Sequence, residues 1–149
     1  MININADSAS YIAQADCQPQ FQFKITFYNS SYVSNVGAYQ SWTMIDKTYK
    51  IPAPKYISSV YIHQWGVIDD CMDIYLNNSL LSRLTISYGC TAHIQWIQTQ
   101  GYLNTDQLEA LKQSLINNHS LEVKGILSDW CGGAIRLEGY GLEITISYE

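Results

Sequence analysis

The sequence predicts an all-β protein, an antiparallel β-sandwich with one short helix. Apolar and polar residues alternate along several short segments, among them residues 20–27, 121–126 and 142–148, as expected where one face of a strand is buried. Apolar residues at helical spacing occur in one segment, residues 104–116. Many short strands with a single helix are typical of two antiparallel sheets packed face to face.

The strands follow in chain order from this alternation and from the residues that interrupt it. After the strand over residues 20–27, the polar residues 28–40 are predicted to form a loop. Residues 42–45 and 48–51 are predicted to be strand, which Pro52 and Pro54 end. Asn77–Asn78 is predicted to be a turn. The remaining predicted strands are residues 56–65, 72–76, 80–86, 91–97, 121–126 and 142–148.

The helix is predicted from four apolar residues, spaced three and four positions apart except for the adjacent last two, which are expected to share one face. Asn104 or Thr105 can cap its first turn, where Asp106 also suits the positive end of the helix dipole. Asn117–Asn118 is predicted to end it. The apolar residues are Leu108, Leu111, Leu115 and Ile116.

The composition limits the class of protein. The 149 residues suit one domain over residues 1–149. Only 14% of them are charged, against about 25% in an ordinary domain, whereas 43 are Ser, Thr, Asn or Gln and 12 are Tyr. Eight basic residues in a chain of net charge −5 exclude an electrostatic nucleic-acid binder. The 47% hydrophobic content argues against disorder, and no segment approaches the run of about 18 apolar residues that spans a membrane.

The N-terminus and the cysteines bear on where the protein works. The first 17 residues contain no basic segment followed by an apolar one, so we expect no secretory signal. The chain then leaves the cell by another route, or is a domain that begins at an added Met1. Cys17, Cys71, Cys90 and Cys131 are too widely spaced for a zinc motif, and buried thiols and disulfides both remain open.

Several short motifs follow one another in a fixed order: Trp42, Ile51–Pro52, Asp69–Asp70, Asn77–Asn78, the helix leading into residues 121–123, and Cys131–Gly132–Gly133. In this order they resemble the galactose-binding-like jelly roll, a sandwich that many carbohydrate-binding and adhesion modules use. They are similar in particular to a module of mating-pair stabilisation proteins of conjugative plasmids and of some phage tail proteins. Asn78 stands where the family has glycine, and asparagine tolerates the same backbone conformation. The resemblance implies a virion or an extracellular appendage as the location, and it suggests a Cys71–Cys131 disulfide.

The acidic residues around position 70 allow two interpretations. Asp70 and Asp73 are candidate calcium ligands, because calcium prefers several carboxylate and carbonyl oxygens. The alternative, which we favour, is that Asp69 bonds to the backbone and shapes the turn, since no EF-hand pattern is present. We therefore expect no required cofactor, with calcium as the exception to test.

Six residues are predicted to bind a ligand. Trp130 beside Asp129 offers an aromatic face for a sugar ring and a carboxylate for its hydroxyl groups. Trp65 precedes the Asp pair, and Tyr32 and Tyr39 lie in the predicted polar loop, whose composition resembles an antibody paratope. Asp70 completes the set. The alternatives are that Trp130 caps the core and that the loop binds nothing. For Trp96 core packing is the better prediction, because Trp96 shares a strand face with the apolar Ile94.

No catalytic motif occurs in the chain, and its three histidines belong to no local catalytic pattern, so we predict no enzyme activity. The sequence instead predicts a recognition or adhesion module of a phage tail or conjugation apparatus. Its partners would be a cell-surface glycan or outer-membrane protein and other subunits of the same assembly. The alternative is a structural subunit of a virion or appendage that assembles with copies of itself.

Overall fold

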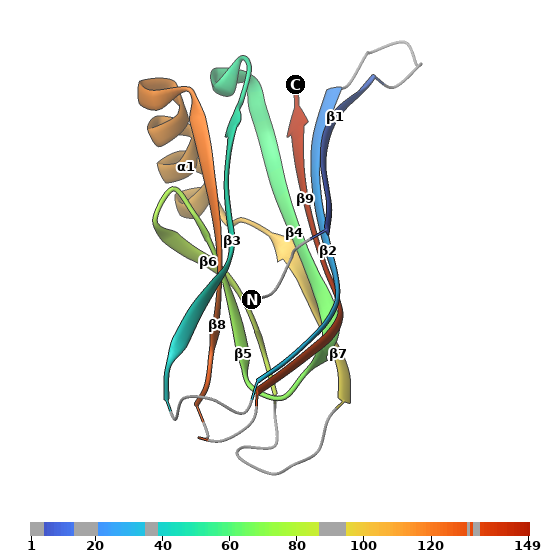
Figure 1. Ribbon diagram of the computed structural model, residues 1–149. Helices are drawn as coiled ribbons and strands as arrows, with labels where there is room; N and C mark the ends of the chain where they lie inside the picture. Colours follow the sequence, from blue (N-terminus) through green and yellow to red (C-terminus); the bar gives the residue numbers. More distant parts are fainter. Residues whose placement is uncertain (1–4, 14–20, 35–38, 87–94, 131, 133–134) are drawn as a thin grey trace.

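The computed structural model describes residues 5–13, 21–34, 39–86, 95–130, 132 and 135–149, and these form two antiparallel sheets and one α-helix (Figure 1). One sheet has five strands in the order β1-β2-β9-β4-β7, and the other has four in the order β3-β8-β5-β6. The strands are β1 (Asn5–Ala13), β2 (Phe21–Ser34), β3 (Ser41–Lys50), β4 (Ile57–Ile68), β5 (Cys71–Leu76), β6 (Ser79–Thr85), β7 (Gln95–Tyr102), β8 (Ser120–Ser128) and β9 (Ile135–Tyr148).

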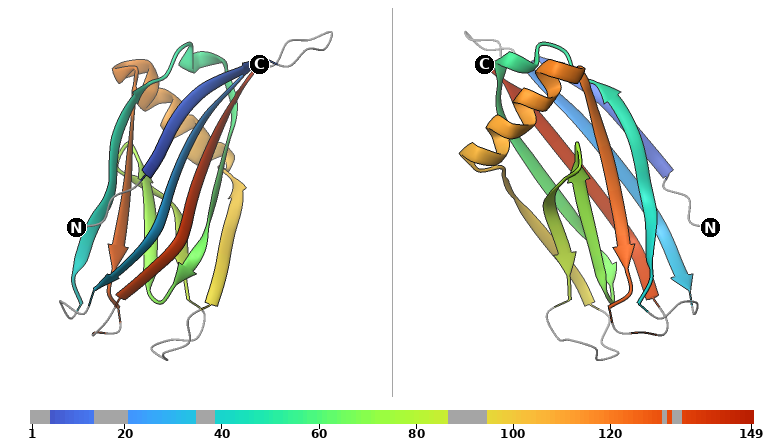
Figure 2. Two further views of the ribbon diagram at one scale, coloured as in Figure 1. Left: turned by 45° about the vertical axis from the view of Figure 1, so that its right-hand side comes forward. Right: turned by 90° about the vertical axis from the view of Figure 1, so that its left-hand side faces the viewer.

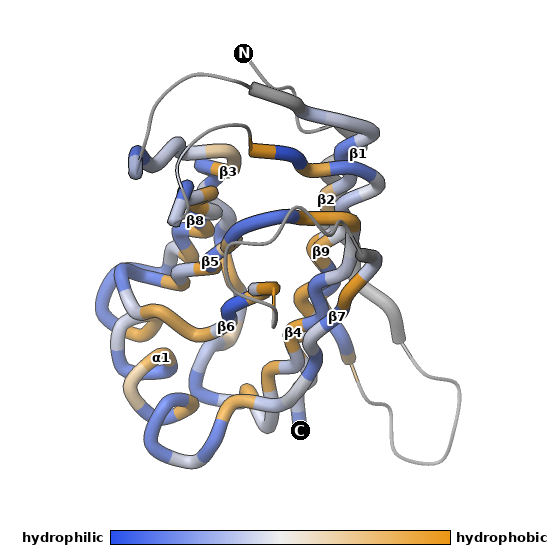
Figure 3. Tube along the Cα trace, turned by 90° about the horizontal axis from the view of Figure 1, so that it is seen from below, coloured by the Kyte–Doolittle hydropathy of each residue, from blue (hydrophilic) through white to orange (hydrophobic). Residues whose placement is uncertain are grey.

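The two sheets lie face to face and enclose the core, so the predicted all-β sandwich with one helix is confirmed. Seen along the strands in Figure 3, β3, β8 and β5 form one layer and β2, β9 and β4 form the other. Alternate residues of each strand point inward, as in β4, where Val60, Ile62 and Gln64 are buried and their neighbours are partly exposed. The C-terminal ends of β2, β4, β6 and β8 lie together at one end of the sandwich, which we call the loop end (Figure 1).

Helix α1 (Thr105–Asn118) links the two sheets between β7 and β8 (Figure 2). Asn104 is its N-cap: the Asn104 side chain accepts a hydrogen bond from the Gln107 N–H over 2.8 Å, and the Gln107 side chain accepts one from the Asn104 N–H over 3.0 Å. Leu111 and Leu115 are buried, whereas Ile116 is exposed, so its predicted place on the shared apolar face is wrong. The capping site predicted from sequence is therefore confirmed, and the helix runs two residues past its predicted end.

The predicted turn at Asn77–Asn78 is also confirmed. Both residues have positive φ, 47° and 68°, the conformation that a two-residue hairpin loop requires. The Asn77 side chain also donates to Ser114 Oγ over 2.8 Å and accepts from the Glu122 N–H over 2.7 Å. One side chain thus ties the β5–β6 hairpin to α1 and to β8.

Two predictions about the strands are wrong. The predicted loop over residues 28–40 is strand as far as Ser34, because residues 28–34 pair with β9 in register from Tyr28–Gly141 to Ser34–Ile135. Of the predicted strand over residues 91–97, residues 95–97 are strand and 91–94 lie outside the described residues; the predicted end is too early, since β7 pairs with β4 as far as Tyr102. In both cases pairing with a neighbouring strand outweighs the polar composition of the segment.

Candidate functional site

The outer face of the five-stranded sheet carries a row of ring side chains along β4. Tyr61, His63 and Trp65 alternate with buried residues and therefore point away from the core. The ring centroids of Tyr61 and His63 are 6.5 Å apart, and those of His63 and Trp65 are 4.7 Å apart. These distances place the three rings in one continuous row.

Strand β7 adds a second row beside the first. Tyr102 lies opposite Tyr61, with 5.0 Å between the ring centroids, and Tyr102 is 70% exposed. The Tyr61 hydroxyl donates a hydrogen bond to the Gln100 side chain, and His63 Nε2 lies 3.0 Å from Gln98 Oε1. We call the six residues of the two rows the aromatic face: Tyr61, His63, Trp65, Gln98, Gln100 and Tyr102.

Gly141 in β9 supports the aromatic face from the side. A Cβ atom at Gly141 would lie 2.1 Å from the Trp65 ring, so the indole occupies the space above this glycine. Tyr28 of β2 pairs with Gly141 from the other side and is 46% exposed. Tyr28 and Trp65 therefore flank a position without a side chain.

The aromatic face is neutral in character. Beside it lie Glu143 of β9, which pairs with His63, and Lys24 of β2; their charged atoms are 3.8 Å apart and offset each other. Ring faces can stack on the apolar C–H side of a sugar, and the amide groups of Gln98 and Gln100 can both donate and accept hydrogen bonds. This combination suits an uncharged ligand rich in hydroxyl groups.

At the loop end, three carboxylates accept hydrogen bonds from main-chain N–H groups. Asp69 accepts from the Arg136 N–H over 2.9 Å, and Asp70 accepts from the Trp130 N–H over 3.1 Å. Asp129 accepts from the N–H groups of Gly132 and Tyr39, over 2.8 and 3.3 Å. Asp69 binds a main-chain N–H group as predicted, but this group belongs to β9, 67 positions away, and not to the turn of Asp69 itself. Asp70 and Asp129, which are both 2% exposed, likewise accept hydrogen bonds from the main chain.

Asp70 carries an unusual charge state. Burial raises the pKa of this carboxyl from 3.8 to about 7, and the charges of Asp69 and Asp129 act in the same direction. The hydrogen bond from the Trp130 N–H opposes these effects without cancelling them. Near neutral pH the Asp70 carboxyl is therefore partly protonated.

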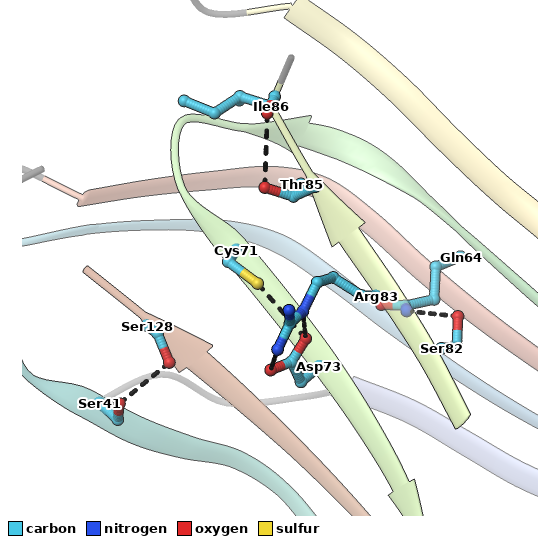
Figure 4. Close-up of polar contacts among 9 residues, drawn as sticks. All are labelled: Ser41, Gln64, Cys71, Asp73, Ser82, Arg83, Thr85, Ile86 and Ser128. Carbon is cyan, nitrogen blue, oxygen red and sulfur yellow. Dashed lines mark hydrogen bonds and ion pairs between the residues drawn. The ribbon is translucent and has the colours of Figure 1, made fainter. Parts of the chain in front are cut away.

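Asp73, the second candidate calcium ligand, forms an ion pair with Arg83. Arg83 Nε and Nη2 donate to the two Asp73 oxygens over 2.7 and 3.0 Å (Figure 4). The same guanidinium lies 5.2 Å from the ring of Trp130. Among the described residues no three His, Cys, Asp or Glu side chains are arranged to hold a metal ion, and calcium binding stays a prediction without support.

Cys71 is a buried free thiol in the structure. Its Sγ lies 3.3 Å from Asp73 Oδ1, and burial raises the pKa of the thiol to about 12. Its suggested disulfide partner, Cys131, lies outside the described residues, as do Cys17 and Cys90. The Cys71–Cys131 pairing therefore stays a prediction.

The predicted ligand-binding residues fall into separate places. Tyr39, Asp70, Asp129 and Trp130 come together at the loop end, whereas Trp65 belongs to the aromatic face. Tyr32 belongs to neither group, because it lies on β2 opposite buried Leu137 and packs against the core.

Sequence reasoning missed most of the aromatic face, and it placed Trp96 wrongly. Trp96 is 56% exposed on the outer side of β7, so the predicted core packing is incorrect. The sequence signal for the aromatic face is that Tyr61, His63 and Trp65 occur at every second position. Gln98, Gln100 and Tyr102 have the same spacing. The period shows that each set shares a face. It does not show which face is outside, or that the two strands are neighbours.

No helix among the described residues has the length and apolar character needed to cross a membrane. Comparisons with protein-family models, curated proteins and solved structures found no match to this chain.

Proposed function

We propose that this protein is a non-enzymatic recognition module that binds a neutral cell-surface glycan on its aromatic face. The observation that carries the proposal is the pair of rows on β4 and β7, in which four rings lie beside two glutamine side chains. Such a surface stacks on sugar rings and hydrogen-bonds their hydroxyl groups without requiring charge.

The loop end is less suited to the same task. The carboxylates of Asp70 and Asp129 are buried and bind main-chain N–H groups, so neither is free to accept from a sugar hydroxyl. Trp130 is 46% exposed, but the Arg83 guanidinium lies near its ring. The aromatic face is therefore the stronger candidate of the two places.

The resemblance to modules of mating-pair stabilisation and phage tail proteins supports a place for this module on such an apparatus, where it would contact the envelope of a recipient or host cell. The low charge of the chain fits a surface that selects glycans by shape and hydroxyl pattern.

The test is a microarray of neutral and acidic glycans, followed by calorimetric titration of the strongest neutral hit. We expect Tyr102→Ala to weaken binding about tenfold or more, which corresponds to about 1.4 kcal/mol. Because Tyr102 is 70% exposed, we expect the Tyr102→Ala variant to fold as the wild-type protein does. Raising the salt from about 50 to 200 mM should change the affinity little, because few charges take part.

Tyr39→Ala and Trp130→Ala are the matched controls, since they remove exposed rings from the loop end. Both should bind as the wild-type protein does. Loss of binding in these two variants, with Tyr102→Ala unaffected, would place the site at the loop end. An array without hits, together with no retention on recipient-cell envelopes, would overturn the proposed function.

A further inference from the structure

Strand β7 is the last strand of the five-stranded sheet, and no described strand pairs with its outer edge. Its sequence, QWIQTQGY, contains no charged residue and no proline. Natural proteins usually protect an exposed edge with lysine, proline, a bulge or a covering segment, because unpaired N–H and C=O groups attract another strand. An eight-residue edge without charge or proline is suited to pairing.

The register with β4 shows which main-chain groups of β7 point to that edge. The Leu103 N–H donates to the Val60 carbonyl over 2.9 Å, so these two residues form a hydrogen-bonded pair. Such pairs alternate with non-bonded ones along an antiparallel ladder, so Gly101 and Thr99 also bond towards β4. The alternate residues of β7 point their main-chain groups to the free edge. These residues are Trp96, Gln98, Gln100 and Tyr102.

We propose that β7 pairs antiparallel with β7 of a second copy of this chain, with the two-fold axis at Thr99. In this register Trp96 lies opposite the partner's Tyr102, and Gln98 lies opposite the partner's Gln100. All four edge-facing residues then form hydrogen-bonded pairs, each exchanging two bonds. A shift by two residues in either direction leaves only three such pairs within β7.

The side chains in this register complement one another. Trp96 and Tyr102 are 56% and 70% exposed in the single chain, and cross-strand pairing places them together as aromatic pairs. The two glutamine pairs between them can exchange side-chain hydrogen bonds. Both sets lie on the outer side of the sheet, so the aromatic faces of the two copies become one surface across the dimer axis. The contact is the same patch on both copies, as a closed two-fold dimer requires.

The test measures the molar mass of the full chain by sedimentation velocity over a concentration series, without glycan. We expect a dimer for the wild-type protein. Gln98→Lys/Gln100→Lys places like charges opposite each other and should be monomeric. Gln98→Glu/Gln100→Lys places opposite charges at the same positions and should be dimeric again. Circular dichroism and the melting temperature report that each variant is folded.

The second variant also tests the register. A shift by two residues would place residue 98 opposite the partner's residue 98, or residue 100 opposite the partner's residue 100. In the Gln98→Glu/Gln100→Lys variant, two glutamates or two lysines would then face each other across the contact, and the variant would stay monomeric. This result would overturn the Thr99 register. A wild-type chain that is monomeric up to about 1 mM, or a Lys/Lys variant that is still dimeric, would overturn the dimer itself. Neither result depends on glycan binding.

Discussion

The Tyr140 hydroxyl donates a hydrogen bond to Gln64 Oε1 over 2.7 Å, and both side chains are fully buried. Gln64 also donates from Nε2 to Ser82 Oγ over 2.8 Å (Figure 4). A chain of hydrogen bonds thus runs from β9 through β4 to β6 and joins the two sheets. Burial raises the pKa of Tyr140 well above its usual value, so the hydroxyl keeps its proton at neutral pH.

Removing this hydroxyl should destabilise the protein without changing its surface. Tyr140→Phe leaves Gln64 Oε1 buried without a donor, which we expect to lower the free energy of unfolding by about 1–3 kcal/mol. Urea denaturation measures the effect. Tyr56→Phe is the control: Tyr56 is 51% exposed, and its variant should stay within about 0.5 kcal/mol of wild type. Equal stability of the two variants would show that the Tyr140–Gln64 bond contributes nothing net.

A single methyl group should disturb the aromatic face. In Gly141→Ala the new Cβ would overlap the Trp65 ring, so the indole must move from its place beside His63. We expect a shift of the Trp65 fluorescence and about tenfold weaker binding of the neutral glycan. Gly101→Ala, in the same sheet, meets no atom within 4 Å and should change neither quantity. Unchanged fluorescence in Gly141→Ala would contradict the position of the Trp65 ring.

Asp70 should make the protein less stable as the pH rises. Its pKa is about 7 when folded and near 3.8 when unfolded, so between these values the folded chain holds the extra proton. The free energy of unfolding should therefore fall as the pH increases from about 4 to 7, by at most about 1.4 kcal/mol per pH unit from this group, and level off above 7.

Asp70→Asn tests this dependence, because asparagine can still accept the Trp130 N–H and carries no charge. Urea denaturation at pH 5 and pH 8 should give a smaller difference for Asp70→Asn than for the wild-type protein. Asp46→Asn, at an exposed site on β3, should keep the wild-type difference. The same difference in Asp70→Asn as in wild type would assign the pH dependence to other groups.

Cys71 should be unreactive until the protein unfolds. Because burial raises the pKa of its thiol to about 12, iodoacetamide at pH 8 should not modify it in the folded protein. In urea without reductant it should be modified fully, as peptide mass spectrometry can measure for this residue alone. Modification that requires a reductant even in urea would instead establish a disulfide at Cys71, as the family resemblance suggests.

Local signals predicted the elements that depend on neighbouring residues in the sequence. Asn104 caps α1 because its side chain reaches the Gln107 N–H three residues later, and Asn77–Asn78 turns because both residues accept positive φ. The alternation of β8 and β9 likewise follows from their own buried residues. Such features require no knowledge of which strands are neighbours.

The candidate site depended on pairing between distant segments, and sequence reasoning therefore found little of it. Tyr28–Ser34 has the composition of a loop, but β9 extends far enough to pair with it. Trp96 lies in an alternating segment whose inner and outer sides cannot be told apart until β4 lies beside it. At the loop end, Asp70 meets the Trp130 N–H across 60 positions of chain.

The Asn77 side chain has a consequence for the order in which the chain folds. The β5–β6 hairpin closes through two residues, so it can form early at a small cost in loop-closure entropy. The Asn77 side chain in its turn bonds to Ser114, Ser120 and Glu122, which are 37, 43 and 45 positions away. These bonds require α1 and β8 to be in place. We therefore expect Asn77→Gly, which keeps the positive φ of the turn and removes only the side-chain bonds, to speed unfolding and leave the folding rate nearly unchanged, as stopped-flow measurements can check.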